Sequence, residues 1–153
     1  MKKAAGFTLV ELMITLAVAA ILLRVAVPAF INMAKSNRLT AQVNMFVTSM
    51  NFARNEAINR RQNFTVEAID DDWTQGWEVT DAGGNVVRVV PALHPATTFT
   101  ANNDTFTFTY QPNGRITGPS DTLAMCDDRN GEQGRQITVS PTGRISVEAV
   151  PCP

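Results

Sequence analysis

The chain has 153 residues, which is enough for one domain and a short additional segment. Thirteen basic and 14 acidic residues give a formal net charge of −1, whereas a protein that coats nucleic acid would carry a basic excess. One His and two Cys argue against a His-centred catalytic site and a Cys-rich zinc site. We therefore expect no catalytic residues, no metal site and no cofactor, and hence not an enzyme.

The N-terminus combines a short basic leader, residues 1–6, with a long apolar segment, residues 7–30. The apolar segment contains only two charged residues, Glu11 and Arg24. As a helix it would be about 36 Å long at ~1.5 Å per residue, which is enough to cross the hydrocarbon layer of a membrane. Arg24 would lie near the outer membrane face, where its side chain can snorkel. No small-residue cleavage site follows the segment, so the sequence predicts a transmembrane helix.

Glu11 is unusual, because a carboxylate in an apolar span costs at least ~2.5 kcal/mol and needs a partner. If the leader is cut after Gly6, the new amine of Phe7 lies one helical turn from Glu11. The amine of one subunit and the carboxylate of a neighbour would then neutralise each other. The alternative is an ordinary signal anchor in which Glu11 lies at the membrane interface.

The run from Gly6 to Leu12, GFTLVEL, resembles the processing motif of type IV prepilins and of type II secretion pseudopilins. The resemblance implies that a prepilin peptidase cleaves between Gly6 and Phe7 and methylates the amine of Phe7. It also implies that Glu11 docks the subunit to a neighbour. Pro28 matches the helix-bending proline of the family, since proline lacks an N–H and clashes with the preceding turn.

Residues 31–61 are predicted to form the amphipathic second half of the same helix. Apolar residues recur in steps of four and three and share one face: Leu39, Val43, Phe46, Met50, Ala53 and Ala57. Polar residues are assigned to the opposite face: Lys35, Arg38, Gln42, Asn44 and Arg60. The apolar face has to be buried in a coiled coil or on a sheet, and the β-rich sequence that follows favours the sheet.

Residues 62–153 are predicted to form a β-rich globular head. The apolar period changes to two, and Gly- and Pro-containing turns separate short segments. We expect strands at 64–69, 77–80, 86–90, 97–100, 105–110, 122–126, 135–140 and 144–150. The fold class is therefore α+β, with a long N-terminal helix packed against a small antiparallel head of two sheets.

Three features of the head are distinctive: Trp73 with Gly76-Trp77, the segment 123–126, and the closing strands 134–139 and 142–146. In these features the head resembles that of the GspH/FimT family, to which FimU-like proteins belong. It implies a minor pilin that primes assembly of a type IV pilus or caps the fibre, in adhesion, twitching or DNA uptake. The alternatives are a pilus-tip DNA-binding pilin for natural transformation and a minor pseudopilin of type II secretion.

The resemblance also implies a location and a set of partners. The chain is expected to cross the inner membrane once, with its head in the periplasm, and to enter the pilus fibre or its tip after assembly. The expected partners are other minor pilins, the major pilin, the prepilin peptidase and the inner-membrane assembly platform. Arg24 departs from the apolar run that is usual in the family.

Cys126 and Cys152 are 26 residues apart, which fits neither a CxxC redox motif nor half of a zinc site. In the oxidising compartment that the resemblance implies, we expect a disulfide between them. Such a bond would stabilise the head by about 3–4 kcal/mol and hold the C-terminal residues against it. The alternative is two unpaired thiols.

Three arginines that each follow a glycine could bind DNA phosphates: Arg115, Arg135 and Arg144. Family members that take up DNA carry Gly-Arg-x-Arg near the C-terminus, and here Ser146 replaces the second arginine. From residue 31 onward, 13 acidic residues face 10 basic ones, which weakens phosphate binding unless the arginines gather. We therefore favour solvated turn arginines, with DNA binding as the alternative.

Two acidic segments, 70–72 and 128–131, resemble fragments of calcium loops. Both lack the remaining oxygen ligands at the required spacing, so we expect solvated turns. His94 precedes Pro95 and has no nucleophile or carboxylate pattern beside it, so its role is expected to be structural.

Overall fold

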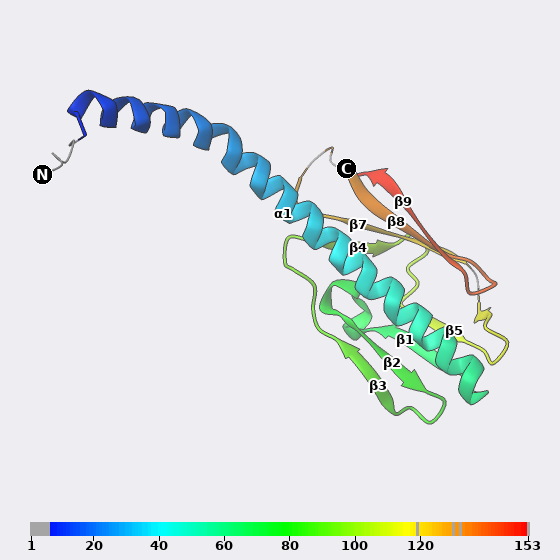
Figure 1. Ribbon diagram of the computed structural model, residues 1–153. Helices are drawn as coiled ribbons and strands as arrows, with labels where there is room; N and C mark the ends of the chain where they lie inside the picture. Colours follow the sequence, from blue (N-terminus) through cyan, green and yellow to red (C-terminus); the bar gives the residue numbers. More distant parts are fainter. Residues whose placement is uncertain (1–6, 119, 130, 132, 153) are drawn as a thin grey trace, which may run out of the picture. The chain divides into compact units, whose positions relative to one another are not determined.

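The computed structural model describes residues 7–118, 120–129, 131 and 133–152. They form one long helix, α1 (Leu9–Arg60), two short 3₁₀ helices, η1 (Ile69–Asp71) and η2 (Trp73–Gln75), and two antiparallel sheets (Figure 1). This is the predicted α+β fold. The contacts divide the chain into two units, and the residues of α1 from Arg38 onward group with the strands.

The first sheet has five strands in the order β3-β2-β1-β5-β6, and the second has four in the order β4-β7-β8-β9. Their bounds are β1 (Phe64–Ala68), β2 (Trp77–Asp81), β3 (Val86–Val90), β4 (Thr98–Ala101), β5 (Thr107–Tyr110), β6 (Ile116–Thr117), β7 (Asp121–Cys126), β8 (Gln133–Val139) and β9 (Ile145–Pro151). The eight predicted strands are all present, with ends that differ by at most two residues. The two-residue strand β6 was not predicted.

The predicted apolar face of the second half of α1 is confirmed. All six of its residues are buried, and they join one core with side chains from both sheets. The ring of Phe46 contacts three other aromatic rings edge-on, at centroid distances of 5.0–5.3 Å: Trp73, Trp77 and Phe99. Because Trp77 belongs to β2 and Phe99 to β4, one helical side chain ties together the two sheets.

One residue of the predicted polar face was assigned to the wrong side. Gln42 is 5% exposed, and its Oε1 accepts a hydrogen bond of 2.9 Å from the hydroxyl of Thr97. It lies three residues after Leu39 and four before Phe46, so helical geometry places it on the apolar face itself. Its polar group is tolerated there because it is hydrogen-bonded.

The acidic segment 70–72, for which turns were expected, forms the end of the short 3₁₀ helix η1 and its link to η2. Asp70 and Asp71 take positive φ values of 53° and 54°, a conformation in which Asp is several-fold enriched. Asp72 caps η2, because its carboxylate accepts hydrogen bonds from the hydroxyl and the backbone N–H of Thr74. These hydrogen bonds lower the pKa of Asp72 below its ordinary value. Its carboxylate therefore has a local structural role.

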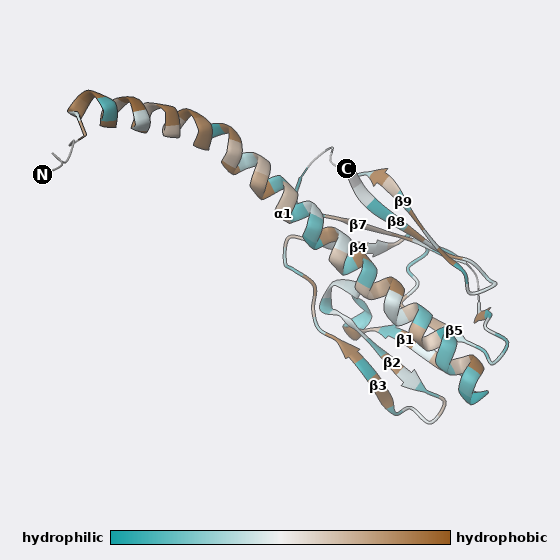
Figure 2. Ribbon diagram, viewed as in Figure 1, coloured by the Kyte–Doolittle hydropathy of each residue, from teal (hydrophilic) through white to brown (hydrophobic). Residues whose placement is uncertain are grey.

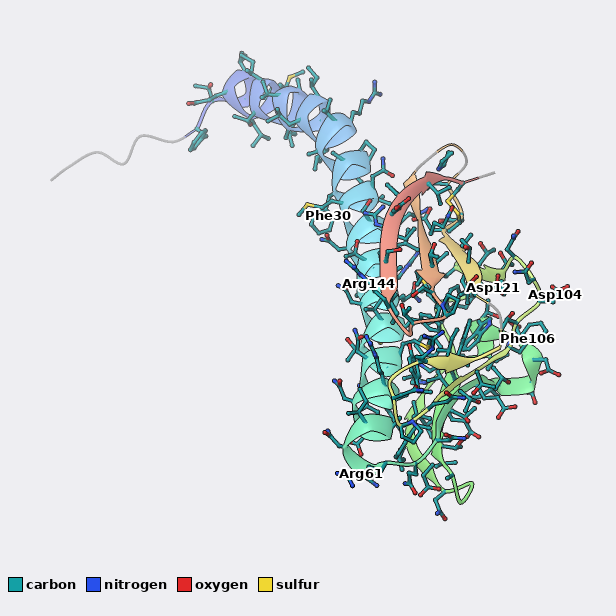
Figure 3. All side chains as sticks on the ribbon, turned by 90° about the vertical axis from the view of Figure 1, so that its right-hand side faces the viewer. Phe30, Arg61, Asp104, Phe106, Asp121 and Arg144 are labelled. Carbon is teal, nitrogen blue, oxygen red and sulfur yellow. A yellow bond between two sulfur atoms is a disulfide. The ribbon has the colours of Figure 1, made fainter. Side chains whose placement is uncertain are left out.

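His94 joins the loop between β3 and β4 to the helix. Nη1 of Arg38 lies 3.0 Å from Nε2 of His94, and Nδ1 of His94 accepts from the N–H of Ala96. Asp121, the first residue of β7, is 2% exposed (Figure 3), and its carboxylate accepts hydrogen bonds from the backbone and side chain of Asn103 in the loop that follows β4. These polar contacts fix the conformation of the two loops. Sequence patterning did not indicate the contact between Asp121 and Asn103.

The disulfide between Cys126 and Cys152 is present and joins the end of β7 to the C-terminal residues. Gly134 lies beside it in β8. A Cβ at Gly134 would lie 2.6 Å from both sulfur atoms and 2.8 Å from the carbonyl oxygen of Met125. The glycine is therefore required by the packing of the disulfide against the sheet.

Replacing Phe46 with Ala should lower the free energy of unfolding by about 3–5 kcal/mol, because the ring is fully buried and its removal leaves a cavity. Met45, its neighbour in α1, is 42% exposed, so Met45→Ala is the matched control. Urea unfolding of the detergent-solubilised chain, followed by tryptophan fluorescence, measures both. Equal midpoints for the two variants would contradict the central role of Phe46.

Gly134→Ala should destabilise the head by about 1–3 kcal/mol, the usual cost of overpacking a filled site. Gly83→Ala is the control, because a Cβ there meets only side-chain atoms of Asn85 and Asp81, at 3.1 and 3.2 Å. Thermal unfolding and alkylation of free thiols report the loss of stability and of the disulfide. A Gly134→Ala chain with unchanged melting and no free thiol would show that the sheet accommodates the methyl group.

Candidate functional site

The N-terminal part of α1 presents a continuous apolar surface. Every large apolar side chain from Phe7 to Met33 is 48% to 79% exposed, including Phe30 (Figure 3). Figure 2 shows this part of the helix as predominantly hydrophobic with a few hydrophilic interruptions, whereas hydrophilic and hydrophobic residues alternate along the later turns. The helix is long and apolar enough to cross a membrane. A surface of this extent needs a cover of lipid or of other apolar helices.

Thr8 caps the start of this helix. Its hydroxyl oxygen accepts the N–H of Glu11 at 3.2 Å, and its carbonyl oxygen accepts the N–H of Leu12. Thr8-x-x-Glu11 is the spacing of a capping box, and a carboxylate in the first turn is favoured by the helix dipole. The sequence interpretation did not include this cap at Thr8, although the spacing was available to indicate it.

The predicted processing and docking residues lie together at this end of the helix. Phe7 is 79% exposed and precedes the cap, whereas Gly6 lies outside the described residues. The Glu11 side chain is exposed, and the described residues offer it no cationic partner. A carboxylate held in the first turn and open to the surroundings is able to accept an ammonium group from a neighbouring chain. Cleavage, methylation and docking stay predictions.

Pro28 lies inside α1, and the helix continues on both sides of it. Because proline has no N–H, the carbonyl oxygen of Arg24 loses its usual donor four residues ahead. The bend expected at Pro28 stays a prediction.

The three glycine–arginine pairs do not form one site. Gly114 and Gly143 lie in two turns that pack closely, because a Cβ on Gly143 would overlap the carbonyl oxygen of Gly114. Their exposed neighbours Arg115 and Arg144 are thereby carried by adjoining turns. Arg135 instead lies in β8, next to the glycine that packs against the disulfide. The glycines thus have packing reasons of their own, and DNA binding stays a prediction.

A shallow groove of about 410 Å³ lies over β4, β7 and β8. Its walls are small or polar side chains without a titratable group: Thr100, Ala101, Asn102, Thr122, Ala124 and Gln136. Among the residues with described positions, no three His, Cys, Asp or Glu side chains gather as a metal site would require. The apolar helix is therefore the strongest candidate for the functional surface.

Two family models match the chain. The model of the type II transport protein GspH matches residues 42–143, about two thirds of the chain, and the model of the prokaryotic N-terminal methylation motif matches residues 1–23. No curated protein matches it significantly.

Solved structures show the same fold. The type IV minor pilin FimU of Pseudomonas aeruginosa is 24% identical, with a TM-score of 0.68 over 77% of this chain and 96% of FimU. The minor pseudopilin EpsH from the type 2 secretion system of Vibrio cholerae is 14% identical, with a TM-score of 0.57 over 73% of this chain and 97% of EpsH. The family model shows that the chain belongs to the GspH family, with a prokaryotic N-terminal methylation motif at its start, and its fold is that of the minor pilin FimU and the minor pseudopilin EpsH.

Proposed function

We propose that this chain is a minor pilin of a type IV pilus that primes assembly or caps the fibre. The observation that carries the proposal is the exposed apolar helix, which begins at the methylation motif and has no cover within the described chain. Proteins of this class assemble with other pilin subunits. The proposed partners are other minor pilins, the major pilin, the prepilin peptidase and the inner-membrane assembly platform.

The proposed pathway starts in the inner membrane, with the head in the periplasm. The prepilin peptidase cleaves between Gly6 and Phe7 and methylates the new amine. The helix stays in the bilayer until neighbouring subunits cover its apolar surface in the fibre. No enzymatic step belongs to this chain in the proposal, because its role is to occupy a place in the fibre.

Glu11 guides the transfer from lipid to fibre. In the bilayer its charge is costly, and pairing with the ammonium group of a neighbour's Phe7 offsets that cost. The hydroxyl of Thr8 caps the backbone N–H of Glu11, which places Glu11 in the first helical turn and its carboxylate at a defined level along the axis. The docking contact therefore sets the axial register between subunits.

A minor pseudopilin of a type II secretion system is the second candidate, since EpsH has the same fold. The greater likeness to FimU, in both identity and TM-score, supports the pilus. Deletion of the chain in its native host separates the two. Loss of surface pili and twitching with normal secretion supports a pilus, and loss of secretion with normal pili supports a pseudopilus.

Glu11→Ala should leave cleavage and methylation intact but reduce the chain in sheared fibres at least about tenfold, because an ammonium group is left unpaired in an apolar interface. Glu56→Ala is the matched control, since Glu56 pairs with Arg60 at the surface of the head. Immunoblots of sheared fibres and membranes give the distribution, and intact mass gives the N-terminus.

Gly6→Val should leave the leader attached, so that intact mass shows a chain that begins at Met1 and sheared fibres contain none of it. Wild-type amounts of either variant in fibres would contradict the assembly proposal. A mature chain that begins after the apolar segment would show that Glu11 has no role in the mature protein. The protein would then be an ordinary secreted domain.

A further inference from the structure

Arg24 is a second charge in the apolar part of α1, thirteen residues beyond Glu11. It is exposed, and its neighbours Leu23 and Val25 are apolar and 60% and 71% exposed. The described residues offer its guanidinium no acidic partner, because the other carboxylate of this segment, Glu11, lies about 20 Å away along the axis at ~1.5 Å per residue. Arg24 therefore needs a partner from outside the chain wherever lipid and water are excluded.

The backbone at the same level is also incompletely paired. Residue 28 is proline, so the carbonyl oxygen of Arg24 lacks the donor that a regular helix would supply. Five guanidinium donors and one carbonyl acceptor thus stand at one level of an otherwise apolar surface. On the same face, Ala20 and Ala17 lie four and seven residues earlier and allow another helix to approach closely.

In a membrane the long side chain reaches the headgroups, but in the proposed fibre other helices replace the lipid. This step rests on the proposed function. A cation enclosed by apolar helices is destabilising unless a carboxylate pairs with it, and arginine binds a carboxylate through two parallel hydrogen bonds. Charge complementarity therefore specifies what covers this face of the helix.

A second copy of the chain does not supply that carboxylate. Copies docked through Phe7 and Glu11 are displaced by four residues, about 6 Å. The Glu11 of such a copy stays about 14 Å or more from the level of Arg24, beyond the span of a salt bridge. The Glu11 of a copy farther along the fibre is already paired with a Phe7 amine in the proposed assembly, so the carboxylate that pairs with Arg24 belongs to a different kind of subunit.

We propose that Arg24 selects, as the neighbour of this chain, a different pilin-like subunit whose apolar helix carries a carboxylate at the level of Arg24. The docking contact displaces the two helices by four residues along the axis, in one direction or the other. The carboxylate of the partner therefore lies about nine or about seventeen residues beyond the glutamate of the partner's own processing motif. Glu11 then gives the axial register, and Arg24 gives the identity of the neighbour.

The test uses the processed full chain, labelled with a fluorescent donor, in phosphatidylcholine vesicles. The probes are three acceptor-labelled 24-residue Leu/Ala helices. The first carries one Glu at the depth of Arg24, the second carries Gln at that position, and the third carries the Glu at a depth that differs by half the length of the membrane-spanning helix. The Glu helix at the matched depth should associate at least about tenfold more tightly than the other two. Arg24→Lys should retain much of this preference, and Arg24→Leu should abolish it.

Equal association of the Glu and Gln helices, or an unchanged preference in Arg24→Leu, would overturn the proposal. A change in helix depth in Arg24→Leu without a change in association would assign the guanidinium to lipid phosphate instead. The vesicle assay contains no fibre, so its result is independent of the fibre incorporation that tests the proposed function. If the chain is absent from native fibres but still prefers the Glu helix in vesicles, the proposed fibre role is contradicted and the proposal for Arg24 is not.

Discussion

The ring of Phe46, enclosed by Trp73, Trp77 and Phe99, is the contact on which the organisation of the head depends. It attaches α1 to both sheets at once, so the apolar face of the second half of the helix is satisfied within the chain. The first half has no such contact, and its apolar side chains stay exposed. One helix thus belongs to two environments, and the change from one to the other falls near Arg38, where the head begins.

This division gives the two halves of the helix different roles. Burial of the second half supplies a stable carrier, because the aromatic core and the disulfide hold the head independently of the membrane. The exposed half supplies the surface for assembly, where lipid and neighbouring helices compete for the same side chains. Since both covers are apolar, hydrophobic burial alone discriminates weakly between lipid and neighbouring helices, and the proposals assign that discrimination to the charged groups of Glu11 and Arg24.

Much of this could be predicted from the sequence because the signals are periodic or local. The helix, its buried face and eight strands follow from apolar spacing, and the processing motif is contiguous. Gln42 was assigned to the wrong face because its polarity was weighed above its position, while its partner Thr97 lies 55 residues away. The meeting of Gly114 with Gly143, and the separate place of Arg135, depend on strand pairing that no local pattern contains.

The same reasoning gives the two intramembrane charges different tasks. Glu11 sits in a capped first turn beside the amine that processing would create, so its position is tied to the end of the helix and suits any subunit with the same motif. Arg24 is tied to no terminus, and Pro28 removes a backbone donor at its level, so the cost of leaving it unpaired depends on what a particular neighbour presents there. In the proposed fibre, the contact between Phe7 and Glu11 fixes the register and Arg24 discriminates among partners, so that subunits of one fold can occupy different places.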